Sequence, residues 1–274
     1  MNIKLCKLLV SWFKLPFHPF NDTNQTYNEW LYEKATDTIS YFLPFAGMDA
    51  IFTDKTVLDI GCGPAGKTLF YAKQGVKKIY GIEILEKYRT QADALAEKLN
   101  LNHLFEFVCA NAKQLPFDDN SIDTVIMSEV FEHIQDPGVV LKEALRVLKP
   151  GGRVYLSFPP YHHPYGAHLK DAIGMPWVHL FFSDETLIKV YSDAVRHLPD
   201  GQERIDFRIS KDENGKEYFS YINKMTMRQA KKIIRCHNPV YQRVIPLKPC
   251  LKILSKLPII KEMFVKMVVY VFEK

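Results

Sequence analysis

The glycine-rich segment at residues 57–66 constrains the fold of this chain more than any other feature. Its sequence is VLDIGCGPAG, in which a short apolar run meets a turn that contains three glycines. A helical pattern follows at 67–74. Glycines between a strand and a helix let the backbone approach a ligand at the edge where open α/β sheets bind cofactors. The segment therefore predicts a strand, a ligand-binding turn and a helix in that order.

Strands and helices alternate from this segment to residue 158. The hydrophobic periods predict strands at 56–60, 78–83, 104–109, 122–128 and 153–158, and helices at 67–74, 85–99 and 138–148. Connections of this kind imply right-handed crossovers and a parallel, doubly wound α/β sheet. A helix at 225–235 and strands at 240–247 and 264–272 follow later, and the last strand can re-enter the sheet.

Residues 159–224 interrupt this alternation. The stretch is rich in aromatic residues and histidine, with a helical pattern at 184–196 and two short strands around Asn214 and Gly215. We expect it to cap the carboxyl edge of the sheet. The predicted organisation is a helical segment at 1–50, a core of 51–158 with 225–274, and a cap insertion at 159–224.

Charge is distributed unevenly along the chain. The net charge is +5, but residues 1–20 carry +3 and residues 224–274 carry +10, which leaves −8 on residues 21–223. Basic ends on an acidic body favour docking of an anionic surface at the ends. Residues 1–14 have an amphipathic helical pattern, which fits either a helix packed on the protein's own core or one lying on anionic lipid.

Composition and cysteine spacing indicate the compartment. The 47% hydrophobic and 24% charged residues are ordinary for a globular protein and exclude a collagen, coiled-coil or disordered chain. The five cysteines form none of the close pairs of zinc or dithiol sites. With no apolar run of about 18 residues and no signal cleavage site, we expect a cytoplasmic protein, docked at the inner membrane face if the first helix binds lipid. Nothing in the sequence indicates an oligomeric state.

The residues around the glycines restrict the cofactor. The spacing of Gly61, Gly63 and Gly66 is formally the dinucleotide fingerprint, so an NAD-dependent oxidoreductase is an alternative. Asp59 would place a carboxylate at the mouth of the loop, where it repels a pyrophosphate and attracts a cation. Pro64 removes an N–H group that a phosphate would use. A cofactor with a sugar, a positive charge and no phosphate fits better, and S-adenosylmethionine is one.

On these motifs, together with Glu83 at the end of the second strand and the LKPGG turn at 148–152, residues 55–158 resemble the class I S-adenosylmethionine-dependent methyltransferases. The resemblance implies a Rossmann-like sheet of seven mostly parallel strands with the last strand antiparallel. It places Asp59, Gly61 and Gly63 beside the methionine part, Glu83 on the ribose, Ile84, Asn111 and Ala112 around adenine, and Ser128 and Glu129 towards the methionine and its methyl group. The usual Gly-Asp-Ala stands here as ANA at 110–112, and Asn111 can still bind the adenine amino group.

The acceptor side offers several candidates. Methyl transfer is a direct displacement that needs alignment, plus a base if the acceptor is a hydroxyl. We consider His133, His162 and His163 as catalytic residues. The sequence EVFEH at 129–133 is similar to an element of ubiquinone-pathway O-methyltransferases and small-RNA 2′-O-methyltransferases, in which it binds a divalent metal. That similarity implies a metal set of Glu129, Glu132, His133 and His179; the alternative is a metal-free His133.

These observations predict a methyltransferase that acts on an oxygen or carbon of a small-molecule or lipid-linked acceptor. An RNA 2′-O-methyltransferase is an alternative, which the acidic body and the lack of a basic aromatic platform argue against. A subunit that binds S-adenosylmethionine without catalysis is a third hypothesis, beside the NAD-dependent oxidoreductase.

Overall fold

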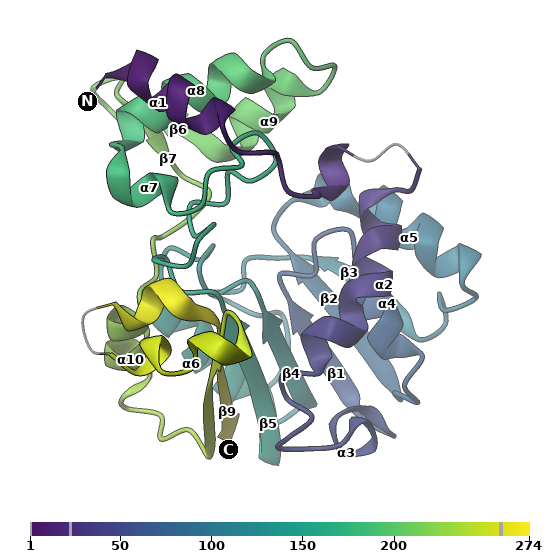
Figure 1. The fold of residues 1–274 in the computed structure, drawn as a ribbon. Coiled ribbons are helices and arrows are strands. Elements are labelled where there is room, and N and C mark those ends of the chain that lie inside the picture. Colours follow the sequence, from purple (N-terminus) through teal and green to yellow (C-terminus); the bar gives the residue numbers. More distant parts are fainter. Residues whose placement is uncertain (1, 22–23, 258–259) are drawn as a thin grey trace.

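A seven-stranded sheet forms the centre of the computed structural model, which describes residues 2–21, 24–257 and 260–274 (Figure 1). The strands are β1 (Thr56–Ile60), β2 (Lys78–Glu83), β3 (Phe105–Cys109), β4 (Ile122–Ser128), β5 (Leu148–Phe158), β8 (Tyr241–Pro246) and β9 (Val265–Glu273). They lie in the order β3-β2-β1-β4-β5-β9-β8, and β9 alone runs antiparallel to both of its neighbours. The predicted fold class is confirmed.

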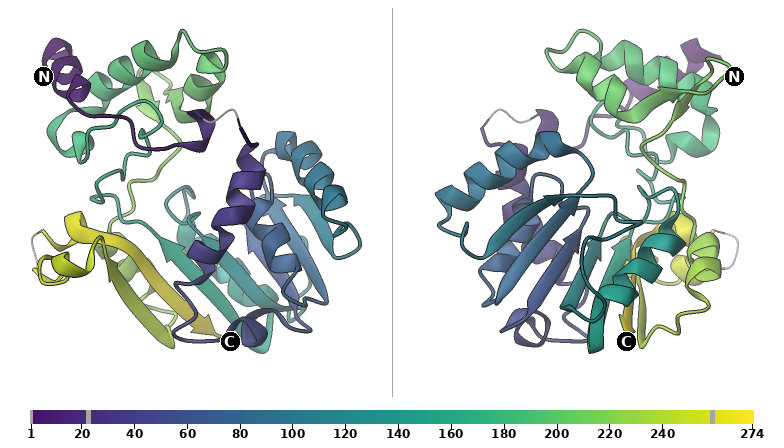
Figure 2. Two further views of the ribbon diagram at one scale, coloured as in Figure 1. Left: turned by 45° about the vertical axis from the view of Figure 1, so that its right-hand side comes forward. Right: turned by 180° about the vertical axis from the view of Figure 1, so that it is seen from behind.

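Helices cover both faces of the sheet (Figure 2). One face carries α2 (Tyr27–Ile39), α3 (Met48–Phe52), α4 (Gly66–Ala72) and α5 (Arg89–Lys98), and the other carries α6 (Pro137–Val147) and α10 (Met227–Ile234). Successive strand residues alternate between the two layers, because side chains of a strand point to opposite faces. In β1, Val57 joins the first hydrophobic cluster and Leu58 the second. This alternation gives the doubly wound arrangement.

The cap lies above the carboxyl edge of the parallel strands (Figures 1 and 2). It contains α7 (Val178–Phe181), α8 (Asp184–Val195), α9 (Gly201–Arg208), β6 (Ile209–Lys211) and β7 (Glu217–Phe219). A third hydrophobic cluster holds it together. Beside that cluster, Asp171 is buried between Arg204 at 3.5 Å and Arg208 at 3.2 Å, and it accepts a 2.9 Å hydrogen bond from the Tyr191 hydroxyl. The cap thus has its own core.

The N-terminal segment is divided between the cap and the core. Helix α1 (Ile3–Ser11) packs on α8 through buried Cys6, and Lys7 Nζ lies 2.8 Å from an Asp193 oxygen. A short 3₁₀ turn, η1 (Pro19–Asn21), leads to α2, which packs on α4 beside the sheet. The first helix therefore covers the cap, and the second covers the core.

Some local details differ from the sequence prediction. The helix expected at 85–99 begins as the 3₁₀ turn η2 (Glu86–Tyr88) before α5, and α3, α7 and α9 were not predicted. Three further 3₁₀ turns, η3 (Pro249–Leu251), η4 (Leu254–Lys256) and η5 (Lys261–Phe264), connect β8 to β9. Among the described residues, no helix has the length and apolar character needed to cross a bilayer.

Candidate active site

A cavity of about 1370 Å³ lies between the cap and the carboxyl edge of the sheet. It sits beyond the ends of β1 and β4, the neighbouring strands from which the chain winds outward in opposite directions. Open α/β sheets bind ligands at this switch point. The volume exceeds the roughly 300–1,000 Å³ of pockets for one drug-sized ligand, so two ligands fit side by side.

The three glycines of the loop have three different surroundings. Gly61 (φ +76°) and Gly63 (φ +53°) both adopt the left-handed conformation that glycine tolerates best. A Cβ on Gly61 would lie 2.2 Å from Val130 Cγ2, and one on Gly66 would lie 2.1 Å from the Asn28 carbonyl oxygen on α2. A Cβ on Gly63 would meet nothing within 4 Å. Of the three glycines, only Gly63 would have open space around an added Cβ, and both Gly61 and Gly63 line the pocket.

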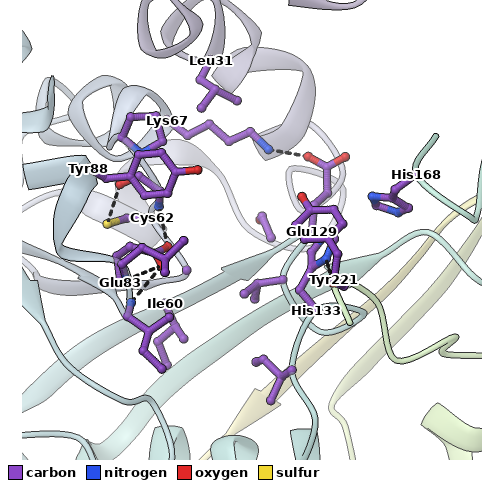
Figure 3. Close-up of a pocket in the computed structure, with 18 of the residues that line it drawn as sticks. Leu31, Ile60, Cys62, Lys67, Glu83, Tyr88, Glu129, His133, His168 and Tyr221 are labelled. Atoms are coloured by element: carbon purple, nitrogen blue, oxygen red, sulfur yellow. Dashed lines mark hydrogen bonds and ion pairs between the residues drawn. The ribbon is translucent and has the colours of Figure 1, made fainter. Parts of the chain in front are cut away.

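Glu83 ends β2 with its carboxylate held by the backbone. One carboxylate oxygen accepts hydrogen bonds from the N–H groups of Ile84 (2.9 Å) and Leu85 (3.0 Å), and the other accepts one from Gly63 (3.1 Å). The carboxylate is thus oriented before any ligand arrives. Figure 3 shows it beside Cys62 and Tyr88 on one side of the pocket.

Asp59 is buried, although the sequence predicted a carboxylate at the mouth of the loop. It is 5% exposed, and the Thr68 hydroxyl donates a 2.6 Å hydrogen bond to its carboxylate. Burial raises the pKa of Asp59 to about 6. Asp59 still lines the pocket.

The residues assigned to adenine also line the pocket. Ile84 is 63% exposed there, next to Asn111 and Ala112. Asn111 Oδ1 accepts a 3.0 Å hydrogen bond from the Lys113 N–H, which leaves one lone pair on that oxygen. Their contact with adenine stays a prediction.

At the end of β4, Ser128 and Glu129 line the same pocket. Glu129 has φ +57° and forms an ion pair with Lys67 of α4 (Figure 3). The Lys67 ammonium lowers the pKa of Glu129. Lys67 carries no motif signal, so its role could not be predicted from the sequence. That Ser128 and Glu129 face the methionine part of a cofactor stays a prediction.

The three histidines proposed as catalytic lie in different places. His162 faces Glu262, with Nδ1 3.0 Å from the carboxylate. His163 lines the pocket, where its Nδ1 accepts a 3.2 Å hydrogen bond from the Tyr165 N–H and burial lowers its pKa to about 4. His133 also lines the pocket, and its Nδ1 lies 2.8 Å from the Tyr221 carbonyl oxygen. Because a carbonyl only accepts, His133 Nδ1 carries the proton and Nε2 presents its lone pair.

The predicted metal set is not assembled. His179 Nε2 donates to the Tyr161 carbonyl oxygen at 2.8 Å and lies within the cap, while Glu129 is paired with Lys67. Among the residues that the structure describes, the group of metal-ligand atoms that comes together belongs to Glu132, His133 and His168, with all three atoms within 4.8 Å of one another. Burial raises the pKa of Glu132 and lowers that of His133 to about 4. His168 stands where His179 was expected. The sequence spacing of these histidines does not determine the path of the chain through the cap, so the prediction chose the wrong one.

Comparison with known proteins assigns the central part of the chain to a domain family. Residues 58–156 match the family model described as a methyltransferase domain. The 27-O-demethylrifamycin SV methyltransferase of Amycolatopsis mediterranei is 32% identical over 146 residues, which are 53% of this chain and 52% of that protein. Residues 58–156 form a class I S-adenosylmethionine-dependent methyltransferase domain. The glycine-rich loop thus belongs to this domain, which argues against its interpretation as a dinucleotide site.

Other relatives match the methyltransferase domain over a shorter stretch. The chloroplastic tocopherol O-methyltransferase of Arabidopsis thaliana is 34% identical over 102 residues, 37% of this chain and 29% of that protein. The 24-methylenesterol C-methyltransferase 2 of the same plant is 38% identical over 102 residues, 37% of this chain and 28% of that protein. The chain spans about half the length, or less, of these curated relatives.

Solved structures share the fold over most of the chain. The MccD protein has a TM-score of 0.55 at 19% identity and covers 86% of this chain and 96% of its own. The [4+2]-cyclase SpnF has a TM-score of 0.53 at 15% identity, covering 99% and 92%. These likenesses show the methyltransferase fold alone, and a fold does not fix a reaction.

Proposed function

We propose that this protein transfers a methyl group from S-adenosylmethionine to an oxygen or carbon atom of a small or lipid-type acceptor. The observation that carries the proposal is Glu83, whose carboxylate is held by three backbone N–H groups beside the glycine-rich loop. The relatives named as O- or C-methyltransferases of a rifamycin, a tocopherol and a sterol support the class of acceptor.

The donor half of the pocket offers one polar group for each part of S-adenosylmethionine. Asp59 would face its cationic methionine part, Glu83 its ribose hydroxyls and Asn111 its adenine amino group. When bound, S-adenosylmethionine supplies an electrophilic methyl group on its sulfonium sulfur. Since methyl transfer is a direct displacement, the main task of these residues is alignment.

Aromatic rings that line the same pocket support an apolar, ring-bearing acceptor. Tyr27 and Trp30 on α2 are stacked at 6.1 Å between ring centroids, and Phe20 meets Tyr27 edge-on at 5.0 Å. From the cap, Phe207 and Tyr221 pack at 4.5 Å and line the same cavity. Such rings offer large apolar area and favourable offset or edge contacts to a planar ligand.

We also propose that α1 docks the protein on an anionic membrane surface, where lipid-type acceptors reside. The side of α1 that faces away from α8 exposes Leu5, Leu8 (53% exposed) and Trp12 (69% exposed). Lys4 and Lys14 flank these apolar side chains in the sequence. An apolar face with basic neighbours is typical of helices that lie in the headgroup region.

Calorimetric titration of the full-length protein with S-adenosylmethionine tests the donor half. We expect binding that Glu83→Gln weakens at least tenfold, because the amide replaces one acceptor oxygen with a donor. Glu86→Gln is the matched control, since that carboxylate pairs with Arg89 on the surface. Tight binding of NAD in place of S-adenosylmethionine, or equal binding by Glu83→Gln and wild type, would refute the assignment.

A further inference from the structure

The buried cluster of Glu132, His133 and His168 lies where the cap meets the core. Glu132 and His133 follow β4 in the core, whereas His168 belongs to the cap insertion. Figure 3 shows His133, His168 and Tyr221 grouped on the side of the pocket opposite Glu83. We propose that these three residues bind one divalent transition-metal ion, which joins the cap to the core beside the acceptor half of the pocket.

Glu132 is the strongest sign of an ion. The residue is 3% exposed, and within the described part of the chain neither carboxylate oxygen has a hydrogen-bond partner. A buried carboxylate without partners is costly, so native proteins pair such a group or give it a metal. The unpartnered oxygens are free to coordinate a cation.

The separations within the cluster suit an ion better than direct hydrogen bonds. Glu132 Oε1 lies 3.7 Å from His133 Nε2 and 4.0 Å from His168 Nε2. Both distances are too long for hydrogen bonds. Ligands bonded at about 2.0–2.2 Å to a tetrahedral or octahedral ion stand roughly 3–3.5 Å apart, so closure around an ion needs movements of about 1 Å.

The surroundings orient the ligands. His133 Nδ1 donates to the Tyr221 carbonyl oxygen at 2.8 Å, which fixes the tautomer whose Nε2 lone pair faces Glu132. This carbonyl contact is the usual outer-shell partner of a metal-bound histidine. The Glu132 carbonyl oxygen in turn accepts a 2.8 Å hydrogen bond from the Asn223 N–H. Both contacts come from the chain that leaves the cap, so the same junction positions the metal ligands.

Two cations near the cluster are already neutralised. Lys67 pairs with Glu129, and Arg208 pairs with Asp171 at 3.2 Å. Neither of these two cations is therefore available to pair with Glu132. Two imidazoles and one carboxylate favour Zn²⁺, Fe²⁺, Mn²⁺ or Co²⁺ over Mg²⁺ or Ca²⁺.

Further coordination positions of the ion would face the acceptor, because His133 and His168 both line the pocket. There the ion can bind an acceptor hydroxyl and lower its pKa, so that the oxygen attacks as an alkoxide or phenoxide and its proton leaves to solvent. This consequence rests on the proposed function, whereas metal binding itself does not.

Binding of Co²⁺ and Zn²⁺ to the untagged full-length protein, stripped with a chelator, tests the site. We expect one equivalent of either ion, with visible d–d bands for Co²⁺. We expect Kd to rise at least 100-fold in His168→Gln and in Glu132→Gln. Glu132→Gln keeps the side-chain shape and removes the buried charge, so it remains informative if His168→Gln does not fold.

His103→Gln, a substitution at an exposed loop residue, is the matched control and should bind as wild type does. Absence of a bound equivalent in wild type, wild-type affinity in Glu132→Gln, or loss of binding in His179→Gln alone would overturn the proposal. Titration of the same samples with S-adenosylmethionine separates the two claims, since its binding depends on Glu83 and not on the metal cluster.

Discussion

At the scale of single residues, the three glycines of the loop have different surroundings that their spacing cannot distinguish. Gly61 approaches Val130 and Gly66 approaches α2, whereas Gly63 faces open space. The sequence predicted the loop correctly because its signal lies within ten consecutive residues. It could not assign the role of each glycine, since the neighbours of Gly61 and Gly66 come from distant parts of the chain.

Alanine substitutions should separate these roles. Gly61→Ala should reduce the free energy of unfolding by about 1–3 kcal/mol more than Gly63→Ala, because its Cβ overlaps the Val130 side chain. Gly63→Ala should fold and lose at least tenfold in affinity for S-adenosylmethionine, because its Cβ enters the pocket. Urea denaturation and calorimetric titration measure the two effects. Equal destabilisation with equal binding would contradict this assignment.

Asp59 should make cofactor binding depend on pH. Burial raises the pKa of Asp59 to about 6. Between the ordinary aspartate pKa of about 4 and this value, the ligand-free native state holds a proton that the unfolded state has released. Its contribution to stability therefore falls as pH rises from its ordinary pKa towards 6.

A cationic ligand needs the carboxylate form of Asp59, so the Kd of S-adenosylmethionine should rise about tenfold for each pH unit below 6. Titrations between pH 5 and 8 should show this slope for wild type and a flat profile for Asp59→Asn; the same slope in both would exclude Asp59 as its origin.

At the scale of elements, α1 has one face packed on the cap and one exposed apolar face. Its sequence pattern predicted an amphipathic helix but left open whether it packs on the protein or on lipid. In the structure Cys6 and Leu9 pack on the cap, while Leu8 and Trp12 remain exposed on the other side. A hydrophobic period identifies an apolar stripe and cannot name its partner, because both partners require the same residues.

Substitutions on the outer face of α1 test its membrane role. Leu8→Ser with Trp12→Ser should abolish sedimentation with anionic vesicles and leave the melting temperature unchanged, because both side chains are exposed. Val139→Ser, which alters an exposed apolar residue of α6, is the control. Vesicle binding by the double variant at wild-type level would refute the docking proposal. Weaker wild-type binding at high salt would reveal the contribution of the basic residues.

At the scale of the whole molecule, the ligand pocket lies between two separately packed parts. The core was predictable because each of its strands and helices has a strong local period and short connections. The cap was predictable only as an interruption, since its histidines are brought to the core by a path that depends on tertiary packing. This is why His168 joins Glu132 and His133, while His179, which the resemblance had favoured, faces Tyr161.

The buried cluster of Asp171, Arg204 and Arg208 should stabilise the cap without affecting the stability of the core. Asp171→Ala would leave Arg204 and Arg208 without their shared buried carboxylate and should cost about 3–5 kcal/mol. Hydrogen exchange should accelerate in α8 and α9 and remain slow in α6, whose residues belong to a different hydrophobic cluster. Uniform acceleration across cap and core would show that the two unfold as one unit.

Methyl transfer itself is the central claim and can be measured directly. The purified protein is incubated with methyl-labelled S-adenosylmethionine and an extract that contains membranes, and the products are partitioned between organic and aqueous phases. We expect wild type to transfer the label to an organic-soluble small molecule, and Glu83→Gln to transfer much less of it. Label confined to the aqueous phase would contradict the lipid-type acceptor. Tight binding of S-adenosylmethionine with no label transferred to any component would contradict methyl transfer and indicate a protein that binds this cofactor without using its methyl group.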